Sequence, residues 1–135
     1  MITVIGLDHV VLRVRDLDAS LRFYRDTLRV PILFLDEYRA GRRAFVSARL
    51  GQQLLDLVPD PTYDPHDGKE HHGFQHLCIE IEAGQWASII AWLTQHGVPV
   101  LDEQPVPRSG ARGLGRSLYV TDPDGYVIEL KEYAT

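Results

Sequence analysis

Cysteine is almost absent from this 135-residue chain, because Cys78 is the only one. One thiol cannot form an intramolecular disulfide, so nothing requires an oxidising compartment, and we expect a cytoplasmic location. Basic residues are in the minority: 14 Lys and Arg against 19 Asp and Glu give a formal net charge of −5, which argues against a nucleic-acid partner. No apolar run reaches the roughly 18–20 residues of a membrane span, which argues against a membrane partner. Residues 1–14 lack a basic start and contain charged residues, which predicts a strand instead of a signal peptide.

Apolar residues in the first part of the chain recur at strand and helix periods. The predicted elements are a strand over 2–14, a helix from Asp16 or Asp18 to about Leu28, and strands over 31–38, 42–50 and 52–58, with Gly51 at a turn. Residues 59–73 have no apolar periodicity and contain three prolines, which predicts a linker.

The same order of elements recurs after the linker. The predicted elements are a strand over 74–82, a helix over 84–96 capped by Gly97, a short strand over 98–103, a glycine-rich loop over 105–116, and strands over 115–121 and 125–133 joined by the turn "DPDG". The sequence therefore predicts an α+β fold of two tandem βαβββ modules, about residues 2–58 and 74–133, within one domain spanning 1–135.

The two modules align by sequence, and the alignment pairs four polar residues. Residues 7–14 match 74–81 with an offset of 67 (74 − 7), residues 54–57 match 127–130 with an offset of 73 (127 − 54), and residues 41–46 match 115–120 with an offset of 74 (115 − 41). In this alignment His9 corresponds to His76, and Asp56 corresponds to Glu129. Each module supplies one histidine from its first strand and one carboxylate from its last.

Strand alternation places all four of these side chains on the face opposite the apolar residues of their strands. Two imidazoles and two carboxylates suit a divalent metal ion of borderline hardness. Such an ion would also explain why Glu129 lies between two apolar residues, since a buried carboxylate is costly without an opposite charge. The alternative is that these are solvated or structural residues, and Asp56 is the weakest member of the set.

The quoted segments resemble the vicinal oxygen chelate superfamily, which includes glyoxalase I, extradiol dioxygenases and fosfomycin-resistance proteins. "HVVLRVRDLDASLRFYRDTL" resembles its opening strand and helix, "GFQHLCIEI" the start of its second module, and "TDPDGYVIELKE" its end. The resemblance implies curved mixed sheets that form a cup around a metal site with ligands His9, His76 and Glu129. Small bacterial glyoxalase I enzymes have a glutamate as fourth ligand where this chain has Asp56.

The resemblance also implies a chemistry. Members bind a small-molecule substrate to a divalent ion (Ni, Zn, Mn, Co or Fe) through two adjacent oxygens and stabilise an enediolate. A glyoxalase-like lyase or isomerase acting on hemithioacetals of 2-oxoaldehydes would use Glu129 as the catalytic base, assisted by Asp56. The alternatives are an Fe(II) dioxygenase of the extradiol type, a fosfomycin-modifying enzyme, and a non-enzymatic drug-binding resistance protein of the bleomycin type. A homodimer is expected on the same grounds.

Three arginines lie in the glycine-rich segment 105–116. Arg108, Arg112 and Arg116 can pair with an anionic group of a substrate, or they can be solvated surface residues. The segment lacks the lysine–serine/threonine ending of a phosphate-binding loop.

Overall fold

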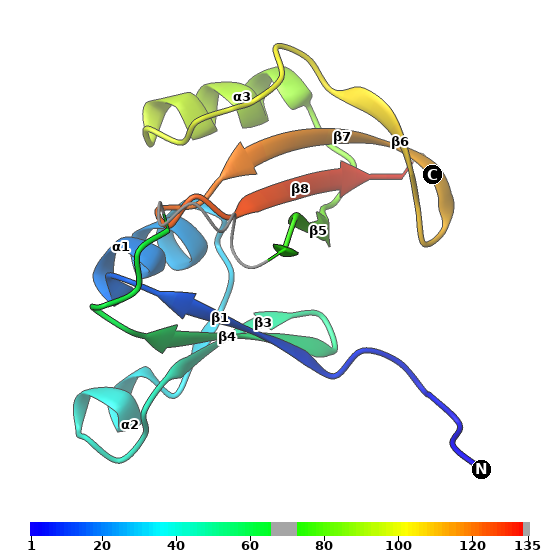
Figure 1. Cartoon of the computed structure of the whole chain (residues 1–135). Coiled ribbons are helices and arrows are strands. Elements are labelled where there is room, and N and C mark those ends of the chain that lie inside the picture. The colour runs from blue at the N-terminus through cyan, green and yellow to red at the C-terminus, as the bar shows by residue number, and fades with distance from the viewer. Residues whose placement is uncertain (66–72, 134–135) are drawn as a thin grey trace. The chain divides into compact units, whose positions relative to one another are not determined.

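The computed structural model describes residues 1–65 and 73–133, which form two compact units, Met1–Asp64 and Pro65–Thr135 (Figure 1). Each unit contains one four-stranded mixed sheet, in the order β1-β4-β3-β2 in the first unit and β5-β8-β7-β6 in the second. The predicted α+β class is confirmed, and neither sheet closes into a barrel. The cup formed by the two sheets remains a prediction, and residues 66–72 of the predicted linker lie outside the described part of the chain.

The first sheet has one parallel and two antiparallel strand pairs. Its strands are β1 (His9–Val14), β2 (Ile32–Leu33), β3 (Val46–Leu50) and β4 (Gln53–Pro59). The strand predicted over 2–14 begins only at His9, which lies opposite Leu54. Because β4 itself starts at Gln53, the residues before Asp8 have no backbone partner in this sheet. The side chains of Ile2 and Ile5 are accordingly exposed.

The predicted first helix is present, in two geometries. The α-helix α1 (Leu17–Leu21) continues as the π-helical segment η1 (Arg22–Thr27). Asp16 is the N-cap, since its side chain accepts hydrogen bonds from the backbone N–H groups of residues 18 and 19. In the π-helical part, the N–H of Leu28 donates to the carbonyl of Phe23, five residues earlier, at 2.9 Å. Leu21 and Tyr24 are buried in the core of this unit.

The strand predicted over 31–38 is wrong for most of its length. Only β2 is extended, and a short helix, α2 (Leu35–Arg39), follows it. Phe34 lies between them with φ of +70°, in the left-handed region, which turns the chain away from the sheet after two ladder residues. Asp36 and Glu37 then occupy the first turn of α2, where negative charge stabilises the helix dipole.

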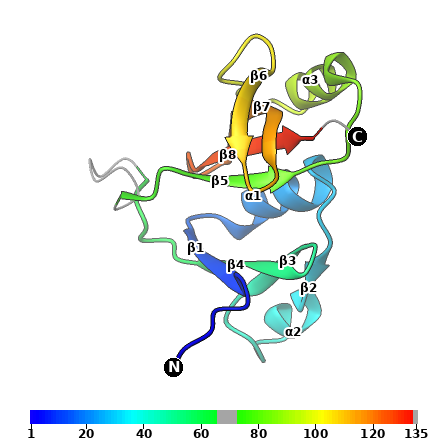
Figure 2. The ribbon, with the colours of Figure 1, turned by 90° about the vertical axis from the view of Figure 1, so that its right-hand side faces the viewer.

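The second unit repeats the topology of the first. Its strands are β5 (His76–Glu80), β6 (Val106–Gly110), β7 (Gly113–Thr121) and β8 (Val127–Glu132), with helix α3 (Trp86–Gln95). Figure 2 shows α3 beside this sheet. The indole Nε1–H of Trp86 donates to Glu132 Oε1 at 2.6 Å, which joins the start of α3 to β8. Gly97 ends the helix with φ of +69°, as predicted for a C-terminal cap.

Two further predictions for the second unit are corrected. The strand predicted over 98–103 reduces to a single bridge between Val100 and Val120. The segment 105–116, predicted as a loop, contains β6 and the start of β7, which form an antiparallel hairpin with Gly110 opposite Gly113. Gly113 has φ of +99°, a backbone angle that glycine adopts readily. Glycine in this segment therefore supports the tight turn of a hairpin, although the glycine content is typical of a loop.

Each unit buries its own apolar side chains against its sheet. In the first unit the fully buried apolar and aromatic side chains include Val14, Tyr24, Val46, Leu55 and Leu57, and in the second they include Leu118, Val120 and Ile128. Within residues 1–65 and 73–133, no helix combines the length and the apolar character needed to cross a membrane.

Candidate functional site

The strand registers of the two units place the four predicted residues at equivalent backbone positions. His9 lies opposite Leu54, two residues before Asp56, and His76 lies opposite Val127, two residues before Glu129. The offsets of 67 for the histidines and 73 for the carboxylates therefore hold in the structure.

The third sequence match is displaced by two residues. Val46 lies opposite Leu57, which corresponds to Leu130, yet the residue opposite Leu130 is Leu118 and not Val120. The offset for this strand is therefore 72 (118 − 46) and not 74. A shift of two residues keeps every side chain on its face, so the predicted faces are unaffected.

In the first unit, the structure brings His9 and Asp56 near each other. His9 Nε2 lies 4.0 Å from Asp56 Oδ2, a distance too long for a hydrogen bond. Asp56 is 7% exposed, and its Oδ1 accepts a hydrogen bond from the buried Ser47 hydroxyl at 2.6 Å. The other oxygen of this carboxylate faces the imidazole.

The other ring nitrogen of His9 is held by the neighbouring residue. Nδ1 lies 2.6 Å from Oδ1 of the exposed Asp8. This hydrogen bond raises the pKa of His9, and the charge of Asp56 adds to the effect, while desolvation opposes it. In the neutral ring, Nδ1–H donates to Asp8 and the lone pair of Nε2 points toward Asp56.

The second unit holds the corresponding pair more closely. His76 Nε2 lies 3.2 Å from Glu129 Oε2, and His76 Nδ1 lies 2.8 Å from the side-chain oxygen of Gln75. The ring of Tyr119 meets the imidazole edge-to-face, with centroids 5.7 Å apart. The Tyr119 hydroxyl also donates a hydrogen bond to Glu129 Oε1 at 3.1 Å. His76 is thus fixed on two sides, with Nε2 facing the carboxylate.

Glu129 is a buried carboxylate held in its ionised form. It is 4% exposed. Burial acts to raise its pKa, but interactions with Ser117, Cys78 and Tyr119 and the charge of Lys131 outweigh burial, so the pKa lies below its ordinary value. The thiol opposite Glu129 on β5 shows the reverse effect, because burial and the negative charge of Glu129 raise the pKa of Cys78 to about 12. Cys78 is therefore a neutral thiol at physiological pH.

The structure shows the two His–carboxylate pairs each within its own unit. Across residues 1–65 and 73–133, no three His, Cys, Asp or Glu side chains come together in a group that could hold a metal ion. The four-residue metal set therefore remains a prediction. Sequence reasoning missed the side chains that orient the pairs, namely Asp8, Ser47, Gln75, Tyr119 and Lys131. Of these, Lys131 had a usable signal, since it lies two residues after Glu129 on the same strand, and Tyr119 and Ser47 each lie opposite a predicted carboxylate across an antiparallel pair.

Two of the three arginines of segment 105–116 pair with carboxylates of the protein. Arg112 Nη1 lies 2.7 Å from Oε1 of Glu80, and Arg116 Nη1 lies 3.9 Å from Oε1 of Glu132. The guanidinium of Arg108 lies 6.0 Å from the ring centre of Tyr119. Of the three, Arg108 is the one directed at a residue that contacts Glu129.

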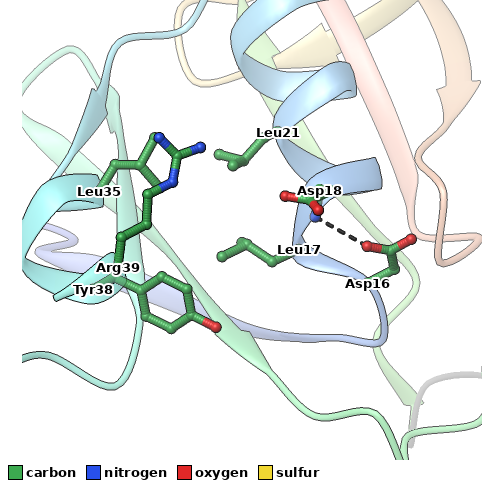
Figure 3. Close-up of a pocket in the computed structure, with 7 residues that line it drawn as sticks. All are labelled: Asp16, Leu17, Asp18, Leu21, Leu35, Tyr38 and Arg39. Carbon is green, nitrogen blue, oxygen red and sulfur yellow. Dashed lines mark hydrogen bonds between the residues drawn. The ribbon is translucent and has the colours of Figure 1, made fainter. Parts of the chain in front are cut away.

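A separate hollow of about 250 Å³ lies in the first unit between α1 and α2. Figure 3 shows Tyr38 and Arg39 of α2 on one side and Asp18 and two leucines of α1 on the other. None of the four predicted ligands lines this hollow.

Comparison with known proteins identifies relatives over nearly the whole chain. The profile of the Glyoxalase/Bleomycin resistance protein/Dioxygenase superfamily matches residues 6–130. The virulence protein STM3117 of Salmonella typhimurium is 30% identical over 94% of this chain and 83% of its own. A probable lactoylglutathione lyase of Synechocystis is 30% identical over 90% and 91%, and the metallothiol transferase FosB of Staphylococcus epidermidis is 26% identical over 93% and 80%.

Solved structures show the same fold. A glyoxalase/dioxygenase from Nostoc punctiforme superposes with a TM-score of 0.76 at 23% identity, covering 97% of this chain and 92% of that one. This likeness supports the βαβββ repeat of both units.

Proposed function

Because the chain belongs to the Glyoxalase/Bleomycin resistance protein/Dioxygenase superfamily, we propose that it is a metal-dependent lyase or isomerase. Its substrate is a small molecule with two adjacent oxygens, of the hemithioacetal class formed by a 2-oxoaldehyde and a thiol. The proposed ligands of a divalent ion are His9, Asp56, His76 and Glu129. The metal can be Ni, Zn, Mn, Co or Fe, and a cytoplasmic location fits the single cysteine.

The donor groups suit such an ion. Each histidine has its Nδ1 hydrogen-bonded to a side-chain oxygen, that of Asp8 or Gln75, which leaves Nε2 directed at a carboxylate. Metal-binding histidines are commonly oriented in this way by an acceptor on the second nitrogen. The observation that carries the proposal is the 3.2 Å approach of His76 Nε2 to the buried, ionised Glu129.

A bound divalent ion would supply Lewis-acid stabilisation of the oxyanion that develops on the substrate. The chain's own part is to move the proton. Glu129 carries a negative charge at neutral pH, so its Oε2, when it is not bound to the ion, can accept a proton from one substrate carbon and return it to the adjacent carbon. The hydroxyl of Tyr119 keeps the other carboxylate oxygen oriented during the transfer.

Metal affinity in solution tests this proposal. Isothermal titration with Ni²⁺, Zn²⁺, Mn²⁺, Co²⁺ and Fe²⁺ should show one high-affinity ion per chain. His76→Ala should weaken binding by at least about 100-fold, since loss of a second-shell partner alone costs up to that factor. The matched control is His96→Ala, because His96 lies at the end of α3, where its Nδ1 contacts a backbone carbonyl. Equal affinities of the two variants would overturn the assignment.

Asp56 decides between a four-ligand and a three-ligand site. If Asp56 binds the ion, Asp56→Asn should lower affinity by at least about tenfold. Unchanged affinity would leave two histidines and one carboxylate, the set used by non-haem iron oxygenases. Turnover of methylglyoxal with several thiols then tests the reaction, and absence of turnover with every metal would exclude the glyoxalase chemistry.

A fosfomycin-modifying activity is the second candidate. It is favoured by the similarity to FosB and by the long distance of 4.0 Å between His9 and Asp56, whose Oδ1 is already bonded to Ser47. Thiol consumption in the presence of fosfomycin and metal is the assay. Oxygen uptake with catechols after anaerobic loading with Fe²⁺ tests the dioxygenase alternative, and ligand binding without any metal would indicate a drug-binding protein.

We also propose that the chain is a homodimer, since closed twofold pairing is the commonest oligomer and is usual in this superfamily. Sedimentation velocity measures the state directly. Mixing His9→Ala with His76→Ala tells whether the ligands come from one chain or two. Ligands from different chains restore one intact site in each mixed dimer, whereas ligands from one chain restore none.

A further inference from the structure

Lys131 is a buried cation beside the candidate carboxylate. It lies on β8 two residues after Glu129, so both side chains project from the same face of the sheet. Lys131 is 2% exposed, although lysine is almost never this buried unless it is paired. Its Nζ donates a hydrogen bond to the carbonyl oxygen of Arg108 at 2.7 Å and lies 3.8 Å from Glu129 Oε1.

The two oxygens of Glu129 have different surroundings. Oε1 accepts the hydroxyl of Tyr119 at 3.1 Å and faces the Lys131 ammonium at 3.8 Å. Oε2 faces His76 Nε2 at 3.2 Å. One oxygen is therefore engaged by groups of the sheet, and the other is directed toward a residue proposed to bind metal.

The β6–β7 hairpin is shaped to accommodate this lysine. A Cβ atom at Gly110 would clash first with the hydroxyl oxygen of Tyr133, and it would lie 2.9 Å from Cε and 3.0 Å from Cδ of Lys131. A Cβ atom at Gly115 would lie 3.4 Å from its Cγ. Since real Cβ atoms essentially never approach within 3.0 Å of a neighbour, the glycine at position 110 leaves space that the Tyr133 hydroxyl and the end of the Lys131 stem share. The burial of Lys131 is thus matched by the sequence of another strand.

We propose that Lys131 is a positioning residue that holds Glu129 by Oε1, so that the carboxylate offers only Oε2 to a cation. This inference rests on the proposed function for the identity of the cation. Lys131 keeps the carboxylate from binding through both oxygens, and its positive charge weakens the attraction of a divalent ion to this site. The result is a carboxylate that binds the ion through one oxygen only.

The test removes the charge and keeps the length of the side chain. Lys131→Met should bind Co²⁺ at least about tenfold more tightly than the wild type, because the repulsion between ammonium and ion is lost. Its visible Co²⁺ spectrum should lose intensity, because a second carboxylate oxygen raises the coordination number. Arg49→Met, which removes an exposed charge from β3, is the matched control and should leave affinity and spectrum unchanged. If Lys131→Met behaves as the control does, the inference is overturned.

A second measurement works without metal. In the metal-free chain, melting temperatures of Lys131→Met, Glu129→Gln and the double variant form a double-mutant cycle. The double variant should be more stable than the sum of the single losses predicts, because each single variant leaves one buried group unpaired. Additive losses would contradict the coupling of the two residues. If the wild type binds no metal but the coupling is present, the proposed function fails while the contact between Lys131 and Glu129 stands.

Discussion

Replacing Glu129 by glutamine removes one charge of a buried pair and should destabilise the metal-free protein strongly at neutral pH. At the observed 3.8 Å from Lys131, two unit charges interact by about 4 kcal/mol at an effective dielectric constant of about 20. Breaking a buried pair on one side costs about 3–5 kcal/mol, since the remaining charge stays buried. The glutamine oxygen still accepts from Tyr119, so we expect a loss of about 3 kcal/mol, or roughly 10 °C in melting temperature.

The pH dependence of this loss has a defined sign. The pKa of Glu129 is lower in the folded state than its ordinary value, because its polar neighbours outweigh burial. A carboxyl group with a lowered pKa contributes stability that is fully present above its unfolded value, about 4.3, and that is lost as the pH falls through the folded value. The difference in stability between the wild type and Glu129→Gln should therefore be largest above pH 5 and should shrink below pH 4.

Urea denaturation at a series of pH values from 3 to 7 measures this difference. The control is Glu103→Gln, which neutralises an exposed carboxylate in the same unit and should change the free energy of unfolding by less than about 0.5 kcal/mol. A loss for Glu129→Gln below about 0.5 kcal/mol at pH 7, or a loss that stays constant down to pH 3, would refute the reasoning.

Three further predictions concern residues of the second unit. Glu132→Ala should cost about 2–3 kcal/mol in urea denaturation, because it removes the acceptor of two hydrogen bonds, of 2.6 and 3.0 Å, at the start of α3. Gly115→Ala should lower the free energy of unfolding by about 1–3 kcal/mol, since a Cβ there would lie 2.5 Å from the carbonyl oxygen of Glu132. The control Gly6→Ala should be neutral, because a Cβ at Gly6 would have no atom within 4 Å. Similar losses for the two variants would contradict the packing around Gly115. Cys78 is exposed, but desolvation and the charge of Glu129 raise its pKa, so the thiol should react with iodoacetamide at pH 8 more slowly than a free thiol, and Glu129→Gln should accelerate the reaction.

The sequence carried the framework of the candidate site because a strand has a period of two and the chain repeats its own pattern. Equal patterns in the two modules sufficed to predict that His9 corresponds to His76 and Asp56 to Glu129, and the ladders reproduce that correspondence. The prediction depended on the strand period within each module and on the repeat between the modules. It held where the paired strands, β1 with β4 and β5 with β8, follow that periodicity.

The failures fall where a single backbone angle or a distant neighbour overrides local pattern. The apolar run 31–38 has strand composition, but Phe34 in a left-handed conformation ends β2 after two residues. Segment 105–116 has loop composition, but Gly110 packs against the side chains of Tyr133 and Lys131, which lie far from it in the sequence. Neither the backbone angle nor the identity of the neighbour can be obtained from spacing within the segment.

The repeat preserves the backbone positions of the two His–carboxylate pairs, but it does not preserve their surroundings. Asp56 accepts one hydrogen bond, from the Ser47 hydroxyl, and its Oδ2 lies 4.0 Å from His9 Nε2. Glu129 accepts a hydrogen bond from the Tyr119 hydroxyl and lies near the buried ammonium of Lys131. Its Oε2 lies 3.2 Å from His76 Nε2. Proton transfer needs a carboxylate whose charge and orientation are both fixed before the substrate arrives. Glu129 meets that condition, which supports our proposal that Glu129 moves the proton while Asp56, at the duplicated position, only assists or binds the ion.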